Sequence, residues 1–461
     1  MYRLCFAALV LLCQYGCAGT VTNYFPVWYN DVNLNMRNRK PFLLCSSVLA
    51  VASLIIARDI LNITIPGMAI ASIITLFMVF FNRRNMYSFA YFLLPLSVGI
   101  PGYIFLLVGL IIFVKQSKLN ISQILPFSIL ALLEITHTIG YNFDYNISGI
   151  FSFLSFLFLF FLMIFSDDRN IDRRVCMICY SMGSIFALGV VYLRIILDYG
   201  FLALVGGELR SGAGMGNYDT EQMMNHLMMN ANCIAYYAIV LISIAFVFMN
   251  KHIVSRSLVF FMIGVGVVFG LLTFSRTWIL LFTMIVLWYL YSNSNDIKSV
   301  LSFLIISVII LIVGLYSGLL DEVLNVFEYR MENDNVESAG GRLPLFKAYN
   351  ELIFSDFRYM MFGTGATYYK QVCQLWNSVH NGTQQIFVSF GLVGIITYLV
   401  VVIRFAKKYI KFKIKKNLIL FAPFIASLIF VQSIQFLNPY PLMFPFVAAS
   451  CMIRINEDYY V

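Results

Sequence analysis

Apolar stretches long enough to cross a membrane recur along almost the whole chain, and this pattern decides the fold class. A helix needs about 20 mostly apolar residues to cross roughly 30 Å of hydrocarbon. With 61% hydrophobic and 11% charged residues, the chain is predicted to be an all-α polytopic membrane protein of about 12 to 14 transmembrane helices. We expect one integral membrane domain over residues 1–461. The candidate spans are 4–20, 42–60, 64–81, 87–114, 121–140, 147–166, 175–197, 228–249, 256–273, 277–292, 299–318, 383–403, 417–436 and 439–453.

The stretch 87–114 is too long for one helix. Gly99-Ile100-Pro101-Gly102 lies in its middle, and proline with glycine breaks a helix. The sequence therefore predicts a short hairpin that returns to its starting side.

The basic residues of the short loops predict the orientation, because Lys and Arg are retained in the cytoplasm. Residues 404–416 hold seven basic residues and no acidic one, and Arg169, Arg173 and Arg174 mark another cytoplasmic loop. This alternation places 198–227 and a long loop, 319–382, on the exterior, or periplasmic, side. Upstream of residue 120 the topology stays open, since the first segment could enter from outside or act as a signal-like piece.

The net charge of +9 does not indicate a nucleic-acid partner, because most of the excess lies in loops that topology requires to be basic. Nine cysteines lie mostly inside spans and imply no disulfide framework. Cys176 and Cys179 form a Cys-x-x-Cys, but a second ligand pair is missing from the sequence pattern. We therefore expect neither a metal site nor a cofactor.

Four residues, Arg210, Arg276, Arg342 and His380, fall in or beside loops that the charge pattern places on the exterior side. Arg276 sits between two long apolar stretches, where a guanidinium is costly unless it has an anionic partner. The alternative is an ordinary interfacial anchor whose side chain snorkels to the surface. Arg210 lies in a glycine-rich loop, 206–214, whose backbone N–H groups could also bind an anion.

The exterior loop begins acidic and passes through Gly340-Gly341 to Arg342. Leu343, Phe346, Tyr349, Asn350 and Ile353 then follow helical spacing, which predicts an amphipathic helix at the membrane surface. The loop is either a structural cap or a platform for a donor or an acceptor, with Arg342 facing the bilayer.

Glu134 and His137 form an i, i+3 pair in the outer half of the fifth span. Ionisable residues at this depth usually face the bundle interior. We keep two interpretations of this pair open, a site lining and a structural polar contact.

The His380-Asn381 pair opens an apolar run, and Gly391 follows ten residues after the Asn. Together with Phe274-Ser275-Arg276-Thr277-Trp278 and with Gly341-Arg342 followed by Gly363-x-Gly365, this order resembles the O-antigen ligase/polymerase superfamily over residues 200–400. Members that are ligases tend to carry a Thr three residues after that Gly, where this chain has Gly394. The departure favours a polymerase.

The resemblance implies a glycosyltransferase in the bacterial cytoplasmic (inner) membrane, with its active site on the periplasmic side. Its donor and acceptor would be oligosaccharides carried on undecaprenyl diphosphate, and a flippase and a chain-length regulator would be its protein partners. The diphosphate leaving group calls for planar cationic donors, which Arg276 and Arg210 supply. His380 could take the proton of the acceptor hydroxyl.

We therefore expect catalytic roles for His380 and Arg276 in a metal-independent, inverting polymerisation of repeat units. Substrate-binding roles are expected for the remaining residues, Arg210, Arg342, Asn381, Glu134 and His137. One alternative is an O-antigen ligase that moves the finished glycan to lipid A core. Another is a lipid-linked oligosaccharide flippase, which would normally show related halves and charges near the bilayer midplane.

Overall fold

The structure is a computed structural model that describes most of the chain. The described residues are 39–116, 121–140, 147–166, 171–201, 204, 226–292, 325, 342–375, 378–411, 418–437 and 442–455. Predicted spans 4–20 and 299–318 lie outside them, and so does Arg210.

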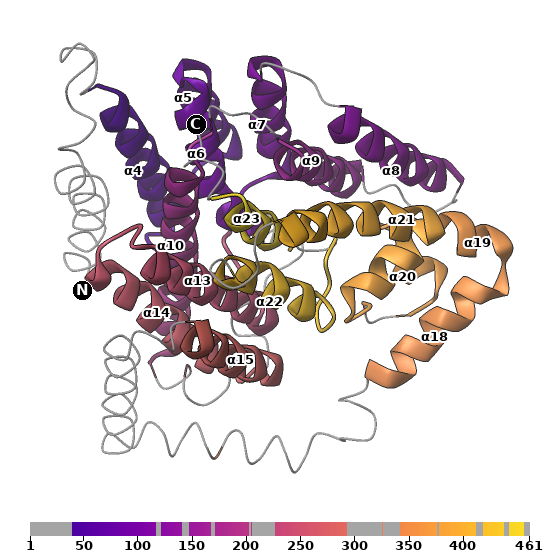
Figure 1. Cartoon of the computed structure of the whole chain (residues 1–461). Helices are drawn as coiled ribbons and strands as arrows, with labels where there is room; N and C mark the ends of the chain where they lie inside the picture. The colour runs from indigo at the N-terminus through magenta and orange to yellow at the C-terminus, as the bar shows by residue number, and fades with distance from the viewer. Residues whose placement is uncertain are drawn as a thin grey trace.

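The described part of the chain is all-helical (Figure 1). Its first half contains α4 (Arg39–Asp59), α5 (Gly67–Phe80), α6 (Arg83–Leu93), the 3-10 helix η2 (Leu94–Val98), α7 (Gly102–Lys115), α8 (Ile121–Gly140), α9 (Ile147–Ile164) and α10 (Arg173–Tyr199). Its second half contains α13 (Ala231–Lys251), α14 (Arg256–Leu271), α15 (Arg276–Ser292), α18 (Arg342–Ser355), α19 (Phe357–Phe362), α20 (Tyr369–Val372), α21 (Gly382–Lys411), η5 (Leu418–Phe421), α22 (Ala422–Val431) and α23 (Met443–Ile453).

Five of the described helices, α4, α8, α9, α10 and α13, are each long and apolar enough to cross a membrane, and α21 reaches this length when the residues on both sides of Gly391 are counted together. Shorter apolar helices cover the other described spans, from α5 and α7 to α14, α15, the η5–α22 pair and α23. The all-helical class is thus confirmed for the described residues, while the number of crossings stays a prediction. The predicted break within 87–114 is also confirmed, because α6 passes into η2 and α7 starts anew at Gly102.

Side-chain caps explain where several of these helices begin. Asn82, Asp172, Asn230 and Ser255 each accept a hydrogen bond from the backbone N–H three residues later, at the starts of α6, α10, α13 and α14. A cap of this kind satisfies one of the N–H groups that the first helical turn leaves without a partner. Short polar residues at the borders of apolar runs therefore set these helix starts.

Helix α13 forms the centre of the bundle. The side chains from Cys233 to Phe248 are all buried, and α10, α14, α22 and α23 pack around them. Gly266 of α14 lies so close to Ile242 that a β-carbon there would approach the Ile242 side chain to 2.5 Å. Small residues let two helices approach closely. This close packing matters in a membrane, because the hydrophobic effect does not drive helices together in lipid.

Helices α18, α19 and α20 gather at one end of the molecule, beside the ends of α8 and α21 (Figure 1). They share a small separate core formed by Tyr349, Ile353, Tyr369, Val379 and Val388. The predicted helix after Arg342 is therefore confirmed as α18, with Tyr349 and Ile353 on its buried side. The aromatic side chains of Phe346 and Phe354 on α18, and of Phe357 at the start of α19, are exposed.

Candidate functional site

Helix α21 is two helical segments that fold back on each other. The backbone of Gly391 is non-helical, with φ of 59° and ψ of −151°. A β-carbon on Gly394 would lie 3.0 Å from the Ile386 carbonyl oxygen, although eight residues span about 12 Å along a continuous helix. Gln385 and Tyr398 likewise both contact Phe436. The segment 382–390 therefore runs antiparallel to the start of 392–411, and we call the two the α21 hairpin.

This geometry corrects the predicted span 383–403. His380 and Asn381 precede a short helix that runs to the turn at Gly391, and the long apolar helix begins only after that turn. Hydropathy could not reveal the break, because both segments are apolar and a single glycine separates them.

Glycine is required at the turn for two reasons. A φ of 59° with a ψ of −151° is a conformation that essentially only glycine adopts. In addition, the backbone of α19 crosses so close that a β-carbon on Gly391 would lie 2.4 Å from the carbonyl carbon of Met361.

Because the helix is interrupted at this turn, the backbone carbonyls just before it receive no hydrogen bond from a following helical turn. The carbonyl of Val388 accepts from the N–H of Thr364 at 2.8 Å, and that of Ser389 accepts from Gly365 at 2.9 Å. Gly363 and Gly365 both have positive φ, 75° and 86°. The Gly363-x-Gly365 motif and Gly391 are thus two halves of one structure.

Glu134 and His137 of α8 attach to this loop from the bundle side. The fully buried carboxylate of Glu134 accepts from the N–H of Ala366 at 2.6 Å and of Thr367 at 2.9 Å. The His137 Nε2 lies 3.1 Å from the carbonyl oxygen of Phe362. In this geometry the pair positions the loop through its backbone.

Glu134→Gln should destabilise the protein, because an amide group has one acceptor oxygen to offer where the carboxylate has two. Leaving one buried N–H unsatisfied typically costs about 1–3 kcal/mol. Thermal melting of the purified protein in detergent measures the loss, and the exposed Glu351→Gln on α18 is the matched control. Equal melting of wild type and Glu134→Gln would contradict the assigned role.

Polar residues that follow His380 tie the α21 hairpin to its surroundings. The Asn381 side chain accepts from the N–H of Gln384 at 2.9 Å and so caps the first segment. Gln384 donates to the carbonyl of Phe346 at 2.8 Å and to Asn350 at 3.0 Å, both on α18. These bonds hold α18, which begins at Arg342, to the first turn of the hairpin. His380, just before this turn, is half-buried.

Gln385 makes the corresponding link to the α22–α23 connection. Its buried carbonyl oxygen accepts from the N–H groups of Phe436 at 2.7 Å and Leu437 at 2.9 Å. Its amide donates to the Tyr369 hydroxyl at 3.4 Å. Burial raises the pKa of Tyr369, so the group that accepts this bond is a neutral phenol oxygen.

Arg276 occupies the corner between α14 and α15. Ser275 caps α15, accepting from the N–H of Trp278 at 3.4 Å, and the buried Trp278 ring packs directly on Gly270. Phe274 has a φ of 49°, which is uncommon for a bulky residue and marks a strained turn. The corner presents Arg276 as an exposed side chain in the first turn of α15.

A neighbouring helix connects this corner to the α21 hairpin. Helix α15 packs against α22, and Val431, the last residue of α22, lies against Gly382. Glu134, His137 and Asn381 thus take part in the hydrogen bonds of the hairpin and its loop. His380 directly precedes Asn381, Arg342 opens the helix that Gln384 binds, and the helix of Arg276 packs against α22.

Several polar contacts of the structure were not predicted from the sequence. The roles of Gln384 and Gln385 were not predicted, although two adjacent amides in an apolar run were a visible signal. It also missed the buried Asp59, which accepts from Arg58 and from the N–H of Leu227 and pairs with His226 Nδ1 at 2.9 Å. The adjacent Arg58 and Asp59 at the end of an apolar run were the signal for that cluster.

Within the described ranges, no three His, Cys, Asp or Glu side chains cluster closely enough to hold a metal ion. Cys176 and Cys179 are buried free thiols.

These features define the class of protein as a helical membrane protein with a polar assembly at the end of its bundle. Comparisons with protein-family models, curated proteins and solved structures found no match.

Proposed function

We propose that the protein is a membrane glycosyltransferase that polymerises undecaprenyl-diphosphate-linked repeat units of a bacterial surface polysaccharide. The observation that carries this proposal is the meeting of the Gly363-x-Gly365 motif with Gly391, at a hairpin that begins beside His380 and Asn381. Motif elements that are scattered in sequence and bonded together in space support a shared role.

In the proposed reaction, a hydroxyl of the acceptor glycan attacks the anomeric carbon of the donor from the side opposite the lipid diphosphate. The new glycosidic C–O bond forms, the bond to the diphosphate breaks, and the configuration inverts. His380 takes the hydroxyl proton, and undecaprenyl diphosphate leaves with the bonding electron pair.

Arg276 stabilises the charge that develops on the diphosphate, because a guanidinium presents two parallel N–H donors to phosphate oxygens. Arg210 and Arg342 assist in binding the donor, and Asn381 holds the segment that carries His380. Glu134 and His137 shape the site by fixing the loop 362–367. A flippase would supply the donor, and a chain-length regulator would act on the growing product.

Gly394 favours polymerisation over transfer to lipid A core. A β-carbon at this position would lie 2.6 Å from the Phe390 β-carbon, so the Thr expected of ligases does not fit this hairpin. Gel profiles of surface polysaccharide from a deletion strain test the proposal. Loss of the ladder with one repeat unit retained on the core supports a polymerase. Loss of all glycan from the core indicates a ligase, and an unchanged ladder would refute both.

The proposed site requires residues 319–382 to be exterior and residues 404–416 to be cytoplasmic, as the seven basic residues of the latter predict. A cysteine placed at Asn377, in a background without native cysteines, should react with a membrane-impermeant maleimide in intact cells. A cysteine at Lys411 should react only after permeabilisation. The reverse pattern would invert the orientation and remove the site from the donor side.

Arg276→Lys should be nearly as harmful to chain extension as Arg276→Ala, because an ammonium keeps the charge but loses the two-pronged geometry. We expect a loss of roughly 2–4 kcal/mol of transition-state stabilisation, as when one preorganised donor is removed. Rates of chain extension with purified donor measure it. Arg256→Lys is the matched control, since Arg256 is also exposed and also opens a serine-capped helix. Full activity of Arg276→Lys would leave Arg276 as an interfacial anchor.

A further inference from the structure

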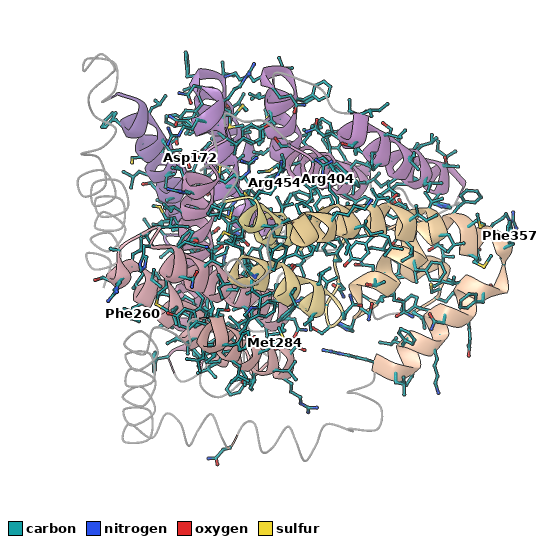
Figure 2. The ribbon with its side chains drawn as sticks, viewed as in Figure 1. Asp172, Phe260, Met284, Phe357, Arg404 and Arg454 are labelled. Atoms are coloured by element: carbon teal, nitrogen blue, oxygen red, sulfur yellow. The ribbon has the colours of Figure 1, made fainter. Side chains whose placement is uncertain are left out.

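Three phenylalanines near the join between α18 and α19 have exposed side chains. Phe354 is 66% exposed, Phe357 is 68% exposed, and Phe362 is 44% exposed. They belong to the segment 354–362, which we call the aromatic elbow. Figure 2 labels Phe357 at the outer edge of the molecule. Exposing large apolar side chains to water is unfavourable, so the surroundings of the elbow have to be identified.

These phenylalanines are not on the apolar face that the sequence predicts for the helix after Arg342. Tyr349 and Ile353 of that face pack into the small core instead of pointing outward. If this region meets the membrane, other side chains therefore make the contact.

The second segment of the α21 hairpin shows how deep the elbow lies. At its start, a β-carbon on Gly391 would meet the backbone of Met361, within the elbow. Near its other end, Arg404 stacks over the ring of Phe165 at 4.9 Å. The distance from Gly391 to Arg404 along a helix is about 20 Å.

Helices α8 and α9 provide a second measure. They run antiparallel, since Gln123 near the start of α8 donates to the carbonyl of Leu162 near the end of α9. Near the end of α8, His137 Nε2 lies 3.1 Å from the carbonyl oxygen of Phe362. The elbow therefore lies level with the start of α9, a helix of 18 residues and about 27 Å in length.

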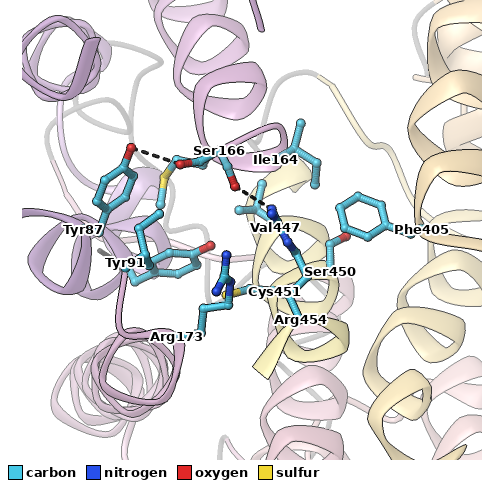
Figure 3. Close-up of a pocket in the computed structure, with 12 residues that line it drawn as sticks. Tyr87, Tyr91, Ile164, Ser166, Arg173, Phe405, Val447, Ser450, Cys451 and Arg454 are labelled. Carbon is cyan, nitrogen blue, oxygen red and sulfur yellow. Dashed lines mark hydrogen bonds between the residues drawn. The ribbon is translucent and has the colours of Figure 1, made fainter. Parts of the chain in front are cut away.

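Arginines mark the far end of both helices. The pocket at the end of α9 is lined by Arg173 and Arg454, and Arg454 donates to the carbonyl oxygen of Ser166 (Figure 3). Phe405, next to Arg404, lines the same pocket. Arginines are costly in hydrocarbon, so this level is expected at a membrane boundary. The elbow lies about 20–27 Å from it, less than the roughly 30 Å thickness of the hydrocarbon layer.

The outward side of α8 leads to the elbow. Leu132, Ile135 and Ile139 are exposed, as expected of the lipid-facing side of a membrane span. Ile135 and Ile139 come two residues before and two residues after His137, which contacts the elbow. The exposed apolar side of α8 therefore reaches the level of the elbow.

The charged residues of the elbow also suit a membrane interface. Arg358 pairs with Asp356 at 2.9 Å, and the Arg358 side chain is 83% exposed. A long cationic side chain can keep its stem against apolar surroundings while its charged head reaches water or lipid phosphates. Exposed aromatic residues beside such an arginine are typical of segments that lie in the interface.

We propose that the aromatic elbow inserts into the interfacial layer of the membrane, where Phe354 and Phe357 contact lipid acyl chains and Arg358 reaches the headgroups. The partner is the lipid surface itself. The proposal does not depend on the glycan-transfer reaction, because it rests on exposed side chains and on the lengths of two apolar helices.

Spin labels on the full chain in liposomes test the proposal. Phe354→Cys and Phe357→Cys, each labelled in a background without native cysteines, should be more accessible to oxygen than to a water-soluble nickel chelate. Ile396→Cys is the lipid-facing reference, since Ile396 is an exposed residue of a predicted span. Gln371→Cys on α20 is the matched control, because Gln371 is exposed and polar. It should show the opposite order of accessibility.

Greater access of the nickel chelate at both phenylalanine positions would place the elbow in water and overturn the proposal. A second measurement needs no variant. The wild-type chain is reconstituted with a phospholipid that carries a photoreactive diazirine in its acyl chain, and the adducts are mapped by mass spectrometry. Adducts should form on residues 354–362 as well as on 392–403. Adducts on 392–403 with none on 354–362 would also overturn the proposal.

Discussion

Replacing His380 with alanine should nearly abolish chain extension while leaving the protein folded in the membrane. A positioned acid–base group contributes about 10²- to 10⁴-fold, and alanine can neither accept nor hold the hydroxyl proton. His380 is half-buried in front of the capped segment of the α21 hairpin, so its removal leaves the cap at Asn381 in place. Extension assays with purified protein and donor, together with accumulation of the lipid-linked donor in cells, measure the effect.

A matched pair of variants separates proton transfer from simple polar contact. His380→Asn keeps a polar side chain but cannot take a proton at neutral pH, so it should be as inactive as His380→Ala. His252→Asn is the control, because His252 is exposed and its left-handed backbone, with φ of 52°, is one that asparagine tolerates. If His380→Ala extends chains at the wild-type rate from pH 6 to 8, another group is the base.

Gly391→Ala should disrupt the hairpin that holds His380. An L residue at this φ and ψ carries about 1–3 kcal/mol of backbone strain. The added β-carbon would also meet the carbonyl carbon of Met361 at 2.4 Å, so α19 would have to move and the bonds from Thr364 and Gly365 would weaken. We expect a lower melting temperature, faster proteolysis between residues 355 and 380, and little chain extension.

Gly264→Ala on α14 provides the control for this substitution. A β-carbon there would meet no atom within 4 Å, and alanine is favoured over glycine in a helix. Its stability should equal or exceed that of the wild type. A Gly391→Ala protein as stable as Gly264→Ala would contradict the close crossing of α19 and the hairpin.

Sequence alone could predict the helical class, since long apolar runs have few stable alternatives in a membrane. It could also place the break before Gly102 and the helix after Arg342, because proline, glycine and helical spacing are local signals. In these cases the physical cause lies within a few residues of the structure it produces.

The α21 hairpin could not be predicted in this way. Its turn depends on α19 crossing at Gly391 and on carbonyls of Val388 and Ser389 finding N–H donors some 24 residues earlier in the chain. Glu134 is buried, as expected of an ionisable residue within a span, but its partners, Ala366 and Thr367, are more than 200 residues away. The spacing of apolar residues along a sequence carries no information about contacts between residues so far apart in the chain.

The folded-back α21 also changes how the membrane crossings of this chain have to be counted. A segment that runs one way and returns contributes nothing to the parity of crossings, so in the proposed topology only the part after Gly391 takes the chain across the membrane. Reporters inserted before Gly382 and after Lys411 should therefore still report opposite compartments, as a single crossing would. Residues 382–390, however, lie alongside the start of the helix that follows Gly391 without being part of it, and they are buried apart from the half-buried Thr383 and Phe387.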